Sequence, residues 1–259
     1  MSIDSPDFAP SGGTADGTPP EARTAVVIPA AGRGVRLGPG APKALRELSG
    51  TPMLVHAVRA TARARAVALV VVVAPSDGDA GVRALLDEHG LSEVVVVPGG
   101  ETRQESVRLG LDALPARIDT VLVHDAARPL VPAGTVDAVA AAVRAGAPAV
   151  VPALPVSDTV KEVEPRGEGA PEPVTGTPDR SRLRAVQTPQ GFDREVLVEA
   201  HERVALQGEG ATDDAGMVER LGVEVVVVPG HEEAFKVTRP LDLVLAEAVL
   251  ARRMARDEY

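Results

Sequence analysis

A glycine-rich loop with two basic residues follows the first apolar run of the chain. Residues 25–43 read AVVIPAAGRGVRLGPGAPK. An apolar strand therefore leads into a loop that contains Arg36 and Lys43, and its glycines let a ligand approach the backbone closely. Backbone amides with fixed positive charge nearby can cradle a phosphate. The loop is neither G-x-G-x-x-G, because Leu37 occupies the third glycine position, nor a Walker A loop. A glycine-rich turn without a ligand is the alternative interpretation of this loop taken alone.

Lysine is rare in this chain, which makes its positions informative. Only Lys43, Lys161 and Lys236 occur among 27 basic residues. Lys43 closes the glycine-rich loop, and Lys236 lies in FKVTRP, which predicts a short strand before a helix that starts with proline, with Thr238 as the capping candidate. Taken alone, Lys236 is explained as well by a solvated strand residue.

Two further segments carry acidic residues. VHDAARP at 123–129 places Asp125 and Arg128 just past an apolar run, where a carboxylate can orient hydroxyls or a hydrated cation, and a turn ion pair is the alternative. TDDAG is explained equally by a helix start, with Thr212 as N-cap and both aspartates complementing the helix dipole. No histidine has metal-ligand spacing, so none is assigned a catalytic role.

The composition excludes several classes of protein. The 259 residues carry a net charge of -10, so nucleic acid and anionic membranes are poor partners, and an anionic ligand must be held by a local basic site. Cysteine is absent, which excludes disulfides and a cysteine nucleophile. No apolar run reaches the roughly 18 residues of a spanning helix and no signal-like start occurs, so we expect a cytoplasmic protein.

Apolar runs alternate with helical patterns along most of the chain. Strands are expected at 25–29, 67–74, 93–97, 120–124, 149–153 and 223–228, and helices near 52–65, 79–89, 102–114, 134–145, 193–206, 213–220 and 240–254. This alternation predicts an α/β fold with a mostly parallel, Rossmann-like sheet flanked by helices. The loops after 29, 97 and 124 should then share one crevice at the carboxyl ends of the strands.

Two segments depart from this alternation. Residues 1–22 are rich in Pro, Gly, Ser, Thr and Asp, which predicts a disordered tail before a single domain over 23–259. Residues 154–188 contain two short strand-like pieces around a turn rich in Pro, Gly and Glu, which predicts a projecting β-hairpin arm. An isolated ribbon is marginally stable, so we expect the arm to pack on a second subunit, with a floppy surface insertion as the alternative.

Seven segments in order resemble the 2-C-methyl-D-erythritol 4-phosphate cytidylyltransferases, which use CTP in the non-mevalonate isoprenoid pathway. The resemblance spans about 24–254. The matching segments are PAAGRGVRLG with PK at 42–43, GGETRQESVRLGL at 99–111, VHDAARP at 123–129, PVSDTVK at 155–161, QTPQGF at 187–192, TDDAGMVE at 212–219 and KVTRPLDLVLAE at 236–247. The resemblance implies a nucleotidyltransferase fold and a homodimer joined through the 154–188 arm.

The resemblance also implies roles for individual residues. Those implied to be catalytic, at the triphosphate, are Arg36, Lys43 and Lys236. Those implied to contact CTP are Ala30, Ala31, Gly32, Gly99, Arg103, Ser106 and Ala126. Those implied to hold methylerythritol phosphate are Asp125, Arg128, Thr159, Arg180, Thr188 and Thr212, with Thr159 and Arg180 presented to the other subunit. Mg²⁺ would be held mainly by the CTP phosphates, with Asp125 at the magnesium shell or the sugar-alcohol hydroxyls.

These residue types suit the implied chemistry. A phosphate monoester is largely dianionic near pH 7, since its second pKa is about 6, so the nucleophile needs no general base. The difficulty is to bring a dianion to a triphosphate, which Arg36, Lys43, Lys236 and one magnesium ion address. A ribitol-5-phosphate cytidylyltransferase and a catalytically silent nucleotide-binding protein are the two alternative functions.

Overall fold

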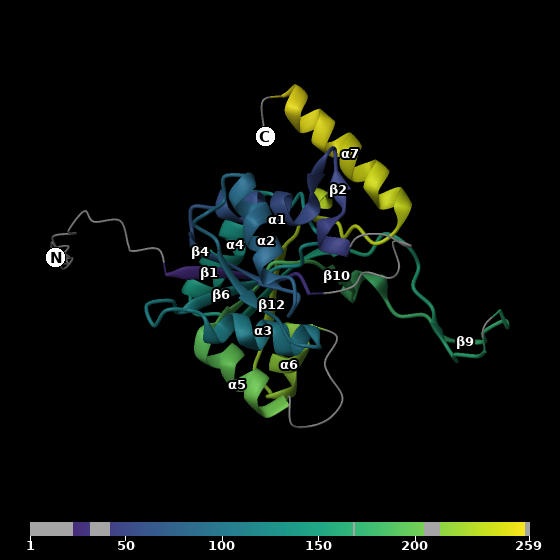
Figure 1. Cartoon of the computed structure of the whole chain (residues 1–259). Helices are drawn as coiled ribbons and strands as arrows, with labels where there is room; N and C mark the ends of the chain where they lie inside the picture. The colour runs from purple at the N-terminus through teal and green to yellow at the C-terminus, as the bar shows by residue number, and fades with distance from the viewer. Residues whose placement is uncertain (1–22, 32–41, 168, 205–212, 257–259) are drawn as a thin grey trace, which may run out of the picture.

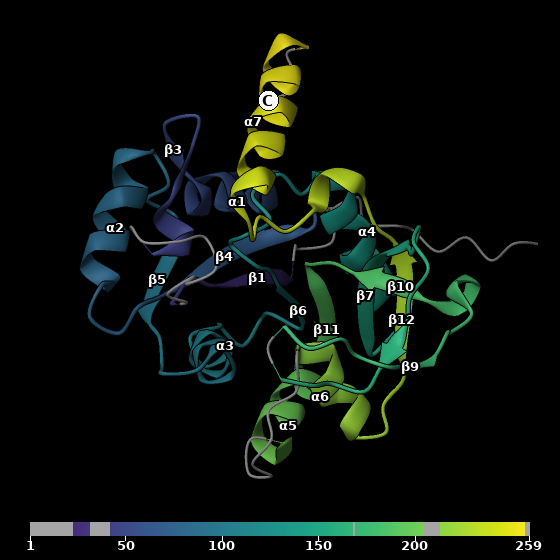
Figure 2. The same ribbon diagram turned by 90° about the vertical axis from the view of Figure 1, so that its right-hand side faces the viewer.

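A central eight-stranded sheet with helices on both faces forms the body of the protein (Figures 1 and 2). The structure, a computed structural model, describes residues 23–31, 42–167, 169–204 and 213–256. The sheet strands are β1 (Thr24–Pro29), β4 (Val67–Ala74), β5 (Val95–Pro98), β6 (Thr120–Val123), β7 (Ala149–Pro155), β10 (Arg184–Val186), β11 (Gln190–Asp193) and β12 (Val225–Pro229). The helices are α1 (Met53–Ala62), α2 (Asp79–Glu88), α3 (Arg103–Asp112), α4 (Ala133–Arg144), α5 (Arg194–Val204), α6 (Asp214–Arg220) and α7 (Pro240–Ala255).

The sheet is mostly parallel, as the alternation of strands and helices predicts. Its path runs β10-β7-β11-β6-β1-β4-β5, and β12 also pairs with β7. The strands β4, β1 and β6 pair in parallel, as do β4 with β5 and β12 with β7. The short strands β10 and β11 are antiparallel to their neighbours. The predicted fold class is therefore confirmed, although β11 was not expected as a strand and β10 falls within the segment expected to form the arm.

Two hydrophobic layers hold the helices on the sheet. Successive strand residues point to opposite faces, so Val26 and Ile28 belong to the core under α1, α2 and α4, while Ala25 and Val27 belong to the core under α3, α5 and α6. Figure 1 shows α3, α5 and α6 gathered on one side of the sheet. Helix α3 approaches closely because Gly110 faces β1, where a Cβ atom would lie 2.6 Å from Val27 Cγ1.

The predicted arm projects away from this body (Figure 1). Its ribbon is formed by β8 (Glu162–Val163) and β9 (Val174–Gly176), which pair antiparallel. Its two ends belong to the main sheet, because Arg184 of β10 pairs with Pro155 of β7. The hairpin is thus present, but the part that leaves the sheet is shorter than 154–188.

Two local predictions near the last helix are wrong. Lys236 lies in a loop between the 3-10 helix η5 (Glu232–Ala234) and α7, not on a strand. The N-cap position of α7 is Arg239 rather than Thr238, and the Asp242 carboxylate accepts from the backbone amides of both residues. The predicted tail, 1–22, lies outside the described residues. In the described part of the chain, no helix is long and apolar enough to cross a membrane.

Candidate active site

The carboxyl ends of β1, β5 and β6 border a crevice that consists of two adjoining hollows. The first, of about 160 Å³, is lined by Pro29, Ala31, Gly100, Glu101, Thr102, Arg103, Ser106 and Asp125. The second, of about 230 Å³, is lined by Arg103, Asp125, Arg128, Val186, Gln187, Thr188, Gln190, Asp213 and Lys236. Arg103 and Asp125 belong to both hollows. The prediction that the loops after 29, 97 and 124 share one crevice is confirmed.

The first hollow is shaped by the turn between β5 and α3. Gly99 donates its backbone N–H to the Ala74 carbonyl at 2.8 Å, and a Cβ atom there would lie 2.7 Å from that oxygen. The buried hydroxyl of Ser106 accepts from the Gly100 N–H and donates to the Thr102 carbonyl. The turn is therefore tied to the first turn of α3, with Arg103 as the first helical residue.

A carboxylate between two cations forms the floor shared by both hollows. Asp125 Oδ2 lies 2.6 Å from Lys236 Nζ, and Asp125 Oδ1 lies 3.7 Å from Arg103 Nη2. Burial alone would raise the pKa of the Asp125 carboxyl, but the charges of Lys236 and Arg103 outweigh burial and lower that pKa to about 2. Asp125 is therefore ionised at neutral pH. The Lys236 side chain is 39% exposed, so it can also reach a ligand.

Thr188 and His124 hold the backbone of Asp125 in place. The Thr188 hydroxyl accepts from the Asp125 N–H at 3.0 Å and lies 3.0 Å from His124 Nδ1. With its proton on Nε2, the His124 ring donates to the Arg128 carbonyl and accepts the Thr188 hydroxyl proton. Burial lowers the pKa of His124 to about 4, which favours this neutral ring. Thr188 is thus engaged within the protein as well as lining the second hollow.

Arg128 is also engaged within the protein. Its guanidinium donates to the Ala234 carbonyl at 2.6 Å and to the Val186 carbonyl at 3.3 Å. These bonds join the loop after β6 to η5 and β10. Because the same loop pairs Val237 N–H with the Ala127 carbonyl, Arg128 helps to position the segment that carries Lys236.

The two aspartates of TDDAG have different positions. Asp213 is the N-cap of α6 and accepts from the Gly216 N–H and from Gln190 Nε2. Asp214 is fully buried and lies 2.7 Å from Arg103 Nη1. The predicted helix start is therefore confirmed, with Asp214 in the first turn of α6, but the N-cap is Asp213 rather than Thr212. No motif signals the contact between Asp214 and Arg103. Thr212 lies outside the described residues.

The remaining predicted site residues divide into three groups. Gly32 and Arg36 lie outside the described residues, and only the backbone of Lys43, the first residue of η2 (Lys43–Leu45), is described. Ala30 and Ala126 are buried beside the crevice. Thr159 and Arg180 are exposed on the arm and line neither hollow, and Arg180 donates to the Ser157 carbonyl.

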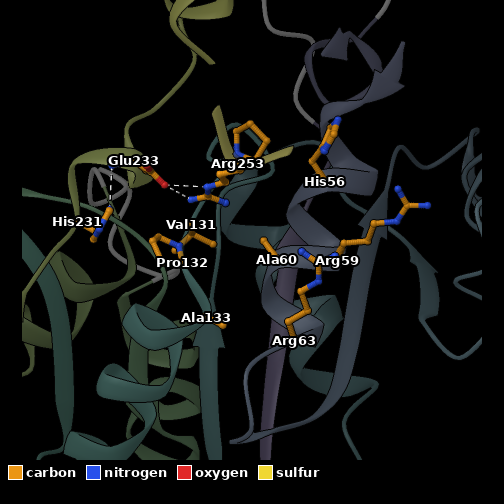
Figure 3. Close-up of a pocket in the computed structure, with 11 residues that line it drawn as sticks. His56, Arg59, Ala60, Arg63, Val131, Pro132, Ala133, His231, Glu233 and Arg253 are labelled. Carbon is orange, nitrogen blue, oxygen red and sulfur yellow. Dashed lines mark hydrogen bonds and ion pairs between the residues drawn. The ribbon is translucent and has the colours of Figure 1, made fainter. Parts of the chain in front are cut away.

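A separate cavity, here called the α1 hollow, lies between α1 and the segments around 131 and 233 (Figure 3). It measures about 340 Å³ and is lined by His56, Arg59, Ala60, Arg63, Pro129, Val131, Pro132, Ala133, His231, Glu233 and Arg253. Arg253 is paired with Glu233 and donates to the Leu130 carbonyl, while Arg59 donates to the His89 carbonyl. No motif of the sequence indicated this cavity.

The crevice combines an ionised carboxylate with partly exposed cationic side chains. Among the described residues, no group of three or more His, Cys, Asp or Glu side chains forms a metal cage. The ionised Asp125 offers carboxylate oxygens, which magnesium accepts beside phosphate oxygens. A mostly parallel sheet with such a crevice at its strand ends defines a nucleotide-binding α/β protein.

Comparisons with known proteins specify the family. The model of 2-C-methyl-D-erythritol 4-phosphate cytidylyltransferase matches residues 24–252. A relative of that name from Streptomyces avermitilis is 74% identical over 246 residues, which cover 93% of this chain and 97% of the relative. The chain therefore belongs to the 2-C-methyl-D-erythritol 4-phosphate cytidylyltransferase family.

Solved structures agree with this assignment. The 4-diphosphocytidyl-2C-methyl-D-erythritol synthase from Anaerococcus prevotii superposes with a TM-score of 0.75 at 27% identity, over 88% of this chain and 96% of that one. The 2-C-methyl-D-erythritol 4-phosphate cytidylyltransferase from Thermus thermophilus superposes with a TM-score of 0.69 at 39% identity, over 87% and 98%. The predicted resemblance is confirmed.

Proposed function

We propose that the protein transfers CMP from CTP to 2-C-methyl-D-erythritol 4-phosphate, releasing pyrophosphate and 4-diphosphocytidyl-2-C-methyl-D-erythritol. Membership of the family supports the reaction. The structural observation that carries it is the pair of hollows joined by Asp125 and Arg103, with Lys236 beside them. One hollow takes the nucleotide and the other takes the acceptor, so that their phosphates meet at the shared floor.

The first hollow and the segments around it suit the nucleotide. We assign the cytosine and ribose side to Ala30, Ala31, Gly32, Gly99, Arg103, Ser106 and Ala126, and the triphosphate to Arg36, Lys43 and Lys236. The close approach of Gly99 to the Ala74 carbonyl fixes the turn that presents Gly100 and the start of α3 to this hollow. Lys236 is well placed for the triphosphate because Asp125 holds its ammonium group while the side chain as a whole is 39% exposed.

The reaction is an in-line displacement at the α-phosphorus of CTP. An oxygen of the acceptor's phosphate bonds to that phosphorus while the bond to the bridging oxygen breaks, and pyrophosphate leaves with the electron pair. The cations Arg36, Lys43 and Lys236 stabilise the charge that develops on the triphosphate. Magnesium would be held mainly by the CTP phosphates, with Asp125 at its shell or at the acceptor hydroxyls, and would supply further charge neutralisation.

The acceptor belongs in the second hollow. Asp125, Arg128, Thr188 and Thr212 are assigned to it, and Thr159 and Arg180 are assigned from the other subunit of a homodimer. Two observations support that arrangement. The arm leaves the body of its own chain (Figure 1), and neither Thr159 nor Arg180 lines the crevice of its own chain. A cytoplasmic location, which the absence of cysteine fits, is part of the proposal.

A pyrophosphate-release assay tests the function and both alternatives. The four nucleoside triphosphates are each paired with methylerythritol phosphate, erythritol 4-phosphate and ribitol 5-phosphate. We expect release only with CTP and magnesium, and at the highest kcat/KM with methylerythritol phosphate. A preference for ribitol 5-phosphate would indicate a ribitol-5-phosphate cytidylyltransferase. No pyrophosphate release with any pair would indicate a catalytically silent nucleotide-binding protein.

A further inference from the structure

A buried carboxylate lies directly beneath the crevice. Asp214, the first residue of α6, has no exposed surface. Its Oδ1 lies 3.1 Å from Nε2 of His201, which is 1% exposed, and its Oδ2 lies 2.7 Å from Arg103 Nη1. An ionised carboxylate is costly to bury unless it is paired, so these two contacts account for its presence in the core.

Arg103 connects this buried acid to the floor of the crevice. Its Nη1 faces Asp214, and its Nη2 lies 3.7 Å from Asp125 Oδ1. The side chain is 37% exposed and lines both hollows. The groups therefore form a row of polar contacts in the order His201, Asp214, Arg103, Asp125 and Lys236, which runs from between α5 and α6 into the crevice.

These contacts restrain the Arg103 side chain, which would otherwise be mobile. Arginine loses rotamer entropy when it is fixed, and its planar fork can be oriented by one firm contact at one nitrogen. Burial would raise the pKa of Asp214, but the hydrogen bond from His201 and the charge of Arg103 lower it. Asp214 therefore keeps its negative charge at neutral pH and holds one end of the guanidinium away from the ligand.

We propose that Asp214, supported by His201, is a positioning residue that orients the Arg103 guanidinium toward the nucleotide hollow. The inference rests on the proposed function, because it assigns Arg103 to the CTP side of the crevice. Without the charge of Asp214, the Arg103 guanidinium loses its fixed orientation and spends less time facing the nucleotide. The consequence is weaker use of CTP, with little effect on the acceptor.

Steady-state kinetics of Asp214→Asn, Arg103→Ala and the double variant test this proposal. We expect Asp214→Asn to raise the KM for CTP about tenfold, with kcat and the KM for the acceptor within about threefold of wild type. The double variant should have the same KM for CTP as Arg103→Ala, because Asp214 acts only through Arg103. A purely structural pair would lower the melting temperature without this split.

Asp137→Asn is the matched control. Asp137 lies on α4, is partly buried and accepts from the Ala66 N–H at 2.9 Å, so the same chemical change removes a hydrogen-bonded carboxylate far from the crevice. It should lower the melting temperature and leave every kinetic constant unchanged. If Asp214→Asn is insoluble, His201→Leu replaces it, with an expected rise of about three- to fivefold in the KM for CTP.

The possible outcomes distinguish a failure of this inference from a failure of the proposed function. Wild-type activity together with a normal KM for CTP in the soluble Asp214→Asn or His201→Leu enzyme would overturn the positioning role alone. Independent, additive effects of Asp214→Asn and Arg103→Ala would overturn it as well. A wild-type enzyme that releases no pyrophosphate would overturn the proposed function and, with it, this inference.

Discussion

The crevice and the α1 hollow contain similar side chains in different arrangements. In the crevice, Lys236 and Arg103 flank Asp125, and both cationic side chains remain more than one-third exposed. In the α1 hollow, Glu233 is 16% exposed and Arg253 is 14% exposed, and they are paired with each other (Figure 3). The Arg253 guanidinium also donates to the Leu130 carbonyl.

The difference shows what separates a site from a structural cluster. A cation that is held yet exposed can stabilise charge on a ligand, whereas a cation whose donors are used by carboxylates and carbonyls stabilises the fold. Volume alone does not discriminate, because the α1 hollow of about 340 Å³ is larger than either hollow of the crevice. The following predictions test this distinction.

Loss of Lys236 should have the largest effect. Because its ammonium group meets charge that develops during transfer, Lys236→Ala should lower kcat about a hundredfold, with a smaller change in CTP affinity, and Lys43→Ala should behave alike. Arg63→Ala, which alters a cation of the α1 hollow, is the control and should keep kcat within about twofold. A Lys236→Ala enzyme with normal kcat and only a raised KM would contradict the assignment.

A mixed dimer tests whether a second chain completes the crevice. Lys43→Ala and Arg180→Ala should each be nearly inactive as homodimers. Random co-assembly makes about half of the dimers mixed, and each mixed dimer has one intact site, so about a quarter of wild-type sites should return. Differently tagged, purified heterodimers that show no more activity than either parent would place Arg180 outside the neighbouring site.

Acid should destabilise the protein through His56, a residue that lines the α1 hollow. Burial lowers the pKa of His56 below its usual 6.5, so the unfolded chain binds the proton first as the pH falls. The free energy of unfolding should therefore decrease below about pH 6.5, by at most about 1.4 kcal/mol per pH unit from this residue. Urea unfolding at pH 7 and pH 5.5 should show a smaller decrease for His56→Gln. An equal decrease in both proteins would contradict the prediction.

Glu233→Gln should change stability without changing catalysis. Removal of this largely buried charge leaves Arg253 with a weaker partner and should lower the free energy of unfolding by about 1–3 kcal/mol. Because Glu233 lines the α1 hollow and neither hollow of the crevice, kcat/KM should stay within about twofold. A tenfold loss of kcat/KM in a folded Glu233→Gln enzyme would show that the α1 hollow takes part in the reaction.

The framework of the fold was predictable because its signals are local. Apolar runs such as 67–74 coincide with β4, and the predicted crevice follows from parallel strands alone. Strand β11 was missed, and β10 was expected only as part of the arm, because both are short and include Arg184, Gln190 and Gly191, which give no β signal. Their pairing depends on β7, which is distant in the sequence.

The candidate site was predictable in its residue types but not in its contacts. Asp213 and Asp214 are adjacent, yet one caps α6 and the other binds Arg103, because Asp213 has extended backbone at the N-cap while Asp214 begins the helix. His201 had no motif around it, since its partner Asp214 lies on another helix. Contacts that join separate elements depend on packing, which no single segment specifies.

A crystal structure with CTP and magnesium tests the central claim most directly. We predict density for the nucleotide in the crevice, with the base beside Gly99 and Ser106 and the triphosphate within reach of Lys236. The α1 hollow should contain no nucleotide. Density for the triphosphate beside Arg63 and Arg253, with an empty crevice, would contradict the account.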